Sequence, residues 1–193
     1  MQIIRILLFA FFAILVGAPL YAVPATLSLP AGPRPGVEEL TIKQAVQQLK
    51  VTGKKGWNLI EAARALVADR MKYSRRNSFD PTGRAFKRGY GYCMQQAYAL
   101  TSLLTELGFE AKVVHAFQNR FPDGKETAHA WVSVRINGET RYIDSLFYNE
   151  QAGELDFTPL SKISDVSLGL KLLTFWGGTA VNAHRYYVTA KDF

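Results

Sequence analysis

The chain has 193 residues, of which 48% are apolar and 12% aromatic, a composition that supports a packed core and excludes a disordered chain. This length predicts one domain, or one domain with a terminal appendage. The formal net charge of +7 favours acidic partners such as anionic polymers, lipid headgroups or nucleic acid. No run of five or six like charges occurs, however, so we expect no nucleic-acid partner.

Residues 1–22 have the pattern of a secretory signal peptide. One arginine precedes the uninterrupted apolar run Ile6–Val16, Gly17 and Pro19 are expected to break the helix, and Ala22 offers a small residue at the cleavage point. A retained membrane anchor is the alternative interpretation. Because the run is shorter than the roughly 20 residues that a spanning helix needs, we expect cleavage, no stable membrane span afterwards, and a secreted or periplasmic protein.

Export changes the meaning of the cysteine content. The chain contains one cysteine, Cys93, and exported proteins use cysteines mainly in disulfide pairs. A single cysteine is therefore a free thiol, an intermolecular bridge or a small buried apolar side chain. The count alone favours burial by about two to one, so the position of Cys93 in the chain must decide.

The first half of the chain is predicted to be helical. Residues 23–40 are rich in proline and glycine and predict a linker, which places the domain at 41–193 with its core at 57–147. A short helix is expected over Thr41–Val51. A stronger helix is expected over Trp57–Tyr73, where apolar residues recur at three- and four-residue steps.

The segment Ser74–Tyr92 is predicted to be a long basic loop that leads directly to the cysteine. Its length indicates a function beyond simple connection. One interpretation is that its arginines and lysines recognise an anionic substrate, such as an acidic peptide or a cell-envelope polymer. An ordinary solvated loop is equally compatible with the pattern.

The second strong helix is expected over Cys93–Leu107, and Gly108 follows where a glycine would end it. Unpaired N–H groups and the positive end of a helix stabilise a thiolate at the helix start and lower the pKa of the cysteine. A structural cysteine would fit better on the apolar stripe of the helix, which alanine and leucine occupy. Position therefore favours a reactive thiol at Cys93.

The second half predicts an antiparallel sheet. Ala111–Phe117 has the pattern of a strand, and Gln118–Thr127 that of a polar loop. The clearest signal is a hairpin, in which His129–Ile136 alternates, Asn137–Gly138 forms a two-residue turn and Glu139–Asp144 returns. Helices followed by an antiparallel sheet define an α+β fold.

The hairpin register places a histidine beside a carboxylate. With Asn137–Gly138 as the turn, Trp131 lies opposite Asp144, and alternation puts His129 on the same face. His129 is then the diagonal neighbour of Asp144, at a distance of about 7–8 Å that the two side chains can close. Taken singly, each would be an ordinary strand-end residue. Together with Cys93 they supply the base and its orienting acid for a thiol nucleophile.

The remaining chain carries weaker patterns. Leu168–Phe175 is expected to be helical and Tyr186–Thr189 to be a strand. His115 is expected to pack within its apolar strand, and His184 lies in the weakly patterned tail. Without zinc-ligand spacing, an acidic calcium loop or a phosphate-binding glycine motif, no cofactor or metal is expected.

These residues also carry a family resemblance. The stretch Gly91–Val114, in which a glycine-x-cysteine opens a helix that ends at Gly108, resembles the cysteine segment of the transglutaminase-like superfamily. His129–Val134 and Tyr142–Asp144 resemble its histidine and aspartate segments. The resemblance covers residues 57–147.

The resemblance implies a papain-like α+β fold in which N-terminal helices pack on an antiparallel sheet. It implies that Cys93 is the nucleophile, His129 the base and Asp144 the orienting acid. The superfamily includes cross-linking acyltransferases, proteases, deglycosylating amidases and inactive relatives. A thiol enzyme that acts on amide bonds of proteins or peptides is therefore expected, and an inactive binding module at the cell envelope is the alternative.

The expected reaction passes through a thioester at Cys93, whose backbone N–H helps to bind the oxyanion. Candidates for a second oxyanion donor are Gln95, Gln96 and Trp57. We expect a monomer, and a dimer linked by a disulfide through Cys93 is the alternative.

Overall fold

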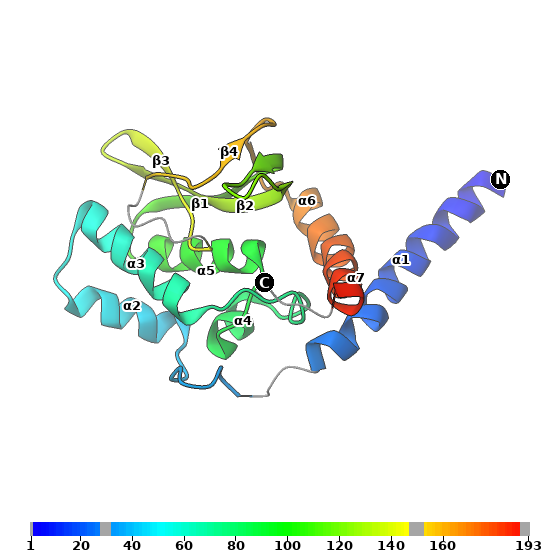
Figure 1. Ribbon diagram of the computed structural model, residues 1–193, viewed down its shortest axis with the longest axis horizontal. Helices are drawn as coiled ribbons and strands as arrows, with labels where there is room; N and C mark the ends of the chain where they lie inside the picture. The colour runs from blue at the N-terminus through cyan, green and yellow to red at the C-terminus, as the bar shows by residue number, and fades with distance from the viewer. Residues whose placement is uncertain (1, 28–31, 147–152, 190–193) are drawn as a thin grey trace. The chain divides into compact units, whose positions relative to one another are not determined.

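The structure is a computed structural model that describes residues 2–27, 32–146 and 153–189 (Figure 1). The chain divides into two compact units. The larger unit contains residues 32–73 and the described part of 81–166, and the smaller unit contains the N-terminal helix, residues 74–80 and the segment from residue 167 onward. The domain predicted at 41–193 stays a prediction.

The larger unit begins with four helices. They are α2 (Ile42–Val51), α3 (Gly56–Arg70), α4 (Thr82–Arg88) and α5 (Cys93–Glu106). Thr41 caps α2, because its Oγ1 accepts from Gln44 N at 3.3 Å while Gln44 Oε1 accepts from Thr41 N at 2.9 Å. The three predicted helices are confirmed. The loop predicted over Ser74–Tyr92 is wrong in part: α4 forms there because Ala85 and Phe86 are fully buried, and such packing stabilises a helix too short to form alone.

The larger unit continues as an antiparallel sheet. Its strands are β1 (Glu110–Arg120), β2 (Glu126–Ile136), β3 (Glu139–Ile143), β4 (Thr158–Pro159) and β5 (Ser164–Asp165). The order is β3-β2-β1-β4, and β5 also pairs with β1. The loop predicted over Gln118–Thr127 is shorter than expected, because β1 and β2 continue their pairing to Arg120 and Glu126.

The predicted hairpin is confirmed. Asn137 and Gly138 have φ angles of 52° and 82°, the left-handed conformation that a tight two-residue turn requires. Ile136 pairs with Glu139 and Val132 with Ile143. The register that the site prediction depends on is therefore present.

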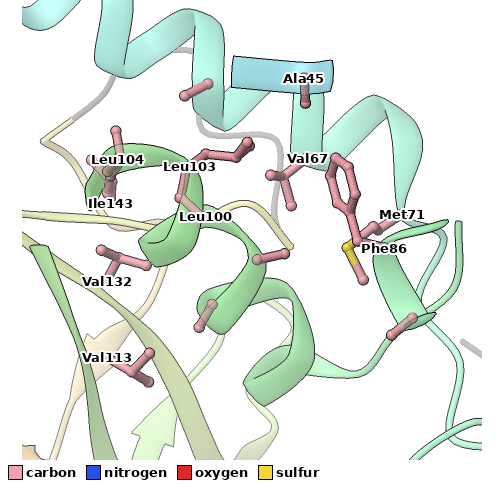
Figure 2. Close-up of a cluster of buried hydrophobic side chains, with 14 of the residues drawn as sticks. Ala45, Val67, Met71, Phe86, Leu100, Leu103, Leu104, Val113, Val132 and Ile143 are labelled. Carbon is pink, nitrogen blue, oxygen red and sulfur yellow. The ribbon is translucent and has the colours of Figure 1, made fainter. Parts of the chain in front are cut away.

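The sheet buries side chains on both faces. One face packs on α5 (Figure 1), and its apolar residues join a cluster that we call the helix-side core (Figure 2). Members of the helix-side core include Leu100, Leu103, Leu104, Val113, Ala130, Val132, Val134 and Ile143. The alternate strand residues, together with two phenylalanines that flank β1 and β4, join a second cluster, which we call the aromatic cluster: Val114, Ala116, Phe121, Trp131 and Phe157. Helices packed on an antiparallel sheet confirm the predicted α+β fold.

The smaller unit contains α1 (Gln2–Leu27), α6 (Leu168–Leu173), a π-helical turn η1 (Thr174–Gly178) and α7 (Thr179–Thr189). Two predictions fail here. No break occurs at Gly17 or Pro19, since α1 runs through both and packs on α7, and tertiary packing overrides local propensity. The strand predicted over Tyr186–Thr189 is instead the last part of α7, while the predicted helix near Leu168 is present as α6.

The first part of α1 is strongly apolar. Over Gln2–Tyr21 its mean hydropathy is 2.5, which makes this helix long and apolar enough to cross a membrane. A signal sequence near an N-terminus has the same length and composition. The helix is therefore compatible with a signal sequence.

Candidate active site

The cysteine lies at the first position of α5. Cys93 is half-buried and carries a free thiol. The preceding Tyr92 is extended, and its backbone N–H donates to Gln95 Oε1 at 3.2 Å. A Cβ at Gly91 would lie 2.6 Å from the Met71 methyl carbon and 3.1 Å from Gln95 Cβ, so a larger residue would have to displace the Met71 side chain. The glycine-x-cysteine sequence thus brings the start of α5 tightly against the end of α3.

A buried histidine and carboxylate face each other across the hairpin. His129 Nε2 and Asp144 Oδ2 are 2.6 Å apart, and their side chains are only 3% and 5% exposed. The other carboxylate oxygen, Oδ1, accepts from the backbone N–H of Leu146 at 3.0 Å. Backbone geometry therefore orients Asp144, and Asp144 orients the imidazole.

The thiol is the second interaction partner of the imidazole. Cys93 is the other side-chain hydrogen-bond partner of His129. Because Nε2 is bonded to Asp144, Nδ1 is the nitrogen left for the sulfur. The structure brings Cys93, His129 and Asp144 together within the larger unit, in the order thiol, imidazole, carboxylate.

The environment of the imidazole favours its protonated form. Burial by itself lowers the pKa of His129, but the charge and hydrogen bond of Asp144, together with those of Cys93, raise it to about 10. The pairing with Asp144 therefore favours the imidazolium form. A buried cation of this kind is stable only because the carboxylate pairs with it.

Aromatic rings surround the imidazole. The ring centroids of Phe157 and Phe121 lie 4.9 Å and 5.5 Å from that of His129, both edge to face, and Trp131 stacks at 6.0 Å. The hairpin register predicts Trp131 on this face. The sequence does not predict Phe157 here, because Phe157 precedes a strand of only two residues, which is too short to show an alternating pattern.

The three candidates for a second oxyanion donor differ in their positions. Both amide hydrogens of Gln96 have backbone acceptors, Met71 O at 3.3 Å and Gly91 O at 3.0 Å. The Trp57 ring packs under the Arg141 guanidinium at 4.9 Å. Arg141 pairs with the fifth residue beyond His129 on β2, about 16 Å along the strand. Gln95, in the first turn of α5, is the remaining candidate.

The cations of the segment before α5 have structural contacts. Lys87 forms an ion pair with Glu39, and the Arg76 guanidinium lies 5.4 Å from the centroid of the Tyr186 ring. Arg75 is buried. Recognition of an anionic substrate by this segment stays a prediction.

The other histidines do not join the site. His115 is buried in β1, edge to face with Phe117 at 4.9 Å, as expected, and His184 Nδ1 lies 3.1 Å from the Tyr21 hydroxyl in the smaller unit. Within the described part of the chain, no group of three or more histidine, cysteine or acidic side chains could hold a metal ion.

Comparisons with known proteins identify the larger unit. A model of the transglutaminase-like superfamily matches residues 43–144. No protein with curated annotation matches the chain. The chain is 15% identical to a TGase of known structure, over 56% of this chain and 31% of that one, with a TM-score of 0.46. It is 14% identical to a protein of Cytophaga hutchinsonii provisionally described as a cysteine protease, over 72% and 50%, also with a TM-score of 0.46. The chain thus spans half or less of the length of each structure.

Proposed function

Because the chain belongs to the transglutaminase-like superfamily, we propose that it is a cysteine-dependent enzyme acting on amide bonds of protein or peptide substrates. Cys93 is the nucleophile, His129 the acid and base, and Asp144 the residue that orients His129. The observation that carries this proposal is the buried 2.6 Å contact between His129 and Asp144 beside the thiol. A cysteine with a purely structural role would not require a buried histidine–carboxylate pair beside it.

In the resting site, the imidazole stands next to the sulfur and accepts the thiol proton as the sulfur attacks. The Cys93 sulfur attacks the amide carbonyl, so that a carbon–sulfur bond forms and negative charge develops on oxygen. The backbone N–H of Cys93, at the unpaired N-terminus of α5, is placed to donate to this oxygen.

Collapse of the intermediate breaks the carbon–nitrogen bond. The amine leaves with the proton that His129 donates, and the acyl group remains on sulfur as a thioester. His129, now neutral, accepts a proton from the molecule that attacks the thioester. Water gives hydrolysis and a carboxylic acid, whereas a second amine gives acyl transfer and a new amide.

The test compares wild type with Cys93→Ala on peptide amides, with and without an added primary amine. Release of ammonia or amine without incorporation indicates hydrolysis, and incorporation indicates transfer. The Cys93→Ala variant should do neither. Wild-type protein as inert as the variant would contradict the proposal and leave a binding module as the alternative.

We further propose that the chain acts outside the cytoplasm, with α1 as the export signal and a monomeric enzyme as the product. The intact mass of the isolated protein separates cleavage near Ala22 from a retained anchor. The contacts of Tyr21 favour retention, since Tyr187 donates from α7 to its carbonyl oxygen at 3.1 Å and the two rings pack at 5.3 Å. A chain that begins near residue 23 would show that these contacts do not survive export.

The substrate is proposed to be anionic, either an acidic peptide or a cell-envelope polymer with amide bonds. The formal net charge of +7 would attract such molecules. Raising the salt concentration should then increase KM with little change in kcat, because screening weakens encounter more than chemistry. A KM that does not change with salt would exclude this substrate class.

A further inference from the structure

The aromatic cluster closes the side of His129 that does not face the thiol. Phe157 lies nearest, at 4.9 Å with the two rings almost perpendicular, and it packs on Phe121 at 5.3 Å and on Trp131 at 5.0 Å. Phe157 is itself only 5% exposed. The imidazole is therefore bordered by three apolar rings, a carboxylate and a thiol.

Phe157 is held in this position by its attachment to β1. The next two residues, Thr158 and Pro159, pair with Arg120 and Asn119. Beyond them, the Leu160 N–H donates to Gln118 O at 2.9 Å. Backbone pairing thus fixes a short segment that has little regular structure of its own.

The same part of β1 carries an irregularity at the level of the histidine. Ala116 pairs with His129, and the register shifts between Ala116 and Asn119. The fully buried Asn119 amide bridges the irregularity, donating to Ala116 O at 2.9 Å and to Thr127 O at 3.1 Å. Bulges of this kind redirect a strand locally and recur beside active sites.

Water competes with His129 and Asp144 for the hydrogen bond that joins them. A charge-assisted hydrogen bond is strong where water is excluded, and weakens when water solvates both partners. Phe157 contacts the imidazole, Phe121 and Trp131 and is itself buried, so its ring fills space that water could otherwise occupy. Its ring also limits rotation of the imidazole, which must keep Nδ1 directed at the sulfur.

We infer that Phe157 is a positioning residue, which excludes water from the His129–Asp144 pair and holds the imidazole in the orientation that serves Cys93. The effect of Phe157 on catalysis rests on the proposed function. The effect of Phe157 on the imidazole is independent of that function, and can be measured on the full-length chain without any substrate.

The experiment follows the ¹⁵N signals of the histidine ring nitrogens from pH 5 to 10.5 in wild type, Phe157→Ala and Phe157→Leu. Asp144 and Cys93 are the titratable groups that interact with His129. Tyr142 of β3 packs on Trp131 at 6.2 Å in the same cluster, and the rings of Phe121, Trp131 and Phe157 do not titrate. Burial is the largest single influence on the pKa of His129 and lowers it, but the interactions with Asp144 and Cys93 together raise it by more. Water should weaken all of these influences and reduce their net effect, so the alanine variant should titrate at a lower pH.

The leucine variant separates water exclusion from general packing. Leucine fills most of the space, so Phe157→Leu should titrate close to wild type. Val114→Ala removes volume from the same aromatic cluster without a ring contact to His129 and should also leave the titration unchanged. An unshifted Phe157→Ala variant, or an equal shift in Val114→Ala, would overturn the inference.

A second variant covers the case in which Phe157→Ala fails to fold. Phe157→Val should then shift the His129 titration in the same direction by a smaller amount, and an unshifted Phe157→Val variant would also overturn the inference. In an active enzyme, Phe157→Ala should lower kcat about tenfold or more with a smaller change in KM, and unchanged kcat would contradict the positioning role. If wild type has no activity, the proposed function fails while the titration still decides the role of Phe157.

Discussion

The two buried faces of the sheet are built from the same strands but bury different kinds of side chain. On β2, Ala130 and Val132 join the helix-side core, whereas the alternate residues His129 and Trp131 lie with the aromatic cluster. The helix-side face of the sheet is aliphatic. The other face holds an imidazole and a carboxylate away from water. One strand therefore supplies stability on one side and the proposed chemistry on the other.

The two faces should respond differently to substitution. An aliphatic core loses stability in proportion to the volume removed, and the effect stays local. A buried polar pair depends on both partners, because removal of one leaves the other uncompensated. Substitutions near the imidazole should therefore change catalysis strongly, and those on the helix side should change stability alone.

The largest expected effect is on the catalytic rate of Asp144→Asn. The amide can no longer stabilise an imidazolium or fix the required tautomer, and comparable changes in catalytic triads lower kcat about 10⁴-fold. Steady-state kinetics on the amide substrate gives the measurement. Asp165→Asn is the matched control, because the exposed Asp165 carboxylate forms an ion pair with Lys112. An equal loss of kcat in this variant would refute the assignment.

The largest expected effect on stability without loss of activity is at Leu104. This fully buried residue is eleven positions along α5 from Cys93, about 16 Å away. Leu104→Ala should lower the free energy of unfolding by about 2–5 kcal/mol, as measured by urea denaturation, with kcat/KM nearly unchanged. Thr105→Ala on the exposed side of α5 should change neither. A large loss of kcat/KM in a folded Leu104→Ala variant would show that the two faces are not separable.

The histidine pair should make stability dependent on pH in one direction. The pKa of His129 is raised from 6.5 to about 10, so the folded state holds a proton that the unfolded chain releases. The stabilisation is complete below about pH 6.5 and is lost as the pH rises towards 10. Urea denaturation at intervals from pH 6 to 10 should show this decline in wild type and not in His129→Asn. If the free energy of unfolding had the same pH dependence in both proteins, the charged His129–Asp144 pair would be contradicted.

The smallest expected effect is at the hairpin turn. Gly138 has a φ of 82° and open space around it, so Gly138→Ala is strained by its backbone conformation alone and should cost about 1–2 kcal/mol. Gly83 in α4 also has open space but no positive φ, and Gly83→Ala should not destabilise. Because the turn sets the register of His129 and Asp144, a Gly138→Ala variant that loses activity beyond its loss of stability would indicate that the register has shifted.

Much of the larger unit could be predicted from the sequence, because local signals there agree with the fold. A strict alternation and an Asn137–Gly138 turn determine which residues pair, and this places His129 beside Asp144. The helix over Cys93–Leu107 has an apolar stripe and a terminating glycine. The aromatic enclosure could not be predicted in this way, since Phe157 reaches the site through pairing between residues about 40 positions apart.

The failures occur where packing outweighs local pattern. Phe86 is buried against the rest of the larger unit and makes α4 helical within a segment that has the composition of a loop. The segment Tyr186–Thr189 has the aromatic and β-branched residues of a strand but ends α7, which packs on α1. In both cases the residues that pack together are far apart in the sequence, and the pattern of a single sequence does not reveal such contacts.

The most direct test of the site measures how fast iodoacetamide labels Cys93 at pH 6 in the native chain. We predict that wild type labels much faster than the urea-unfolded chain, because the His129–Asp144 pair activates the thiol, and that Asp144→Asn labels as slowly as the unfolded chain. Native wild type that labels no faster than the unfolded chain, or Asp144→Asn that labels as fast as native wild type, would contradict the claim that this pair activates Cys93.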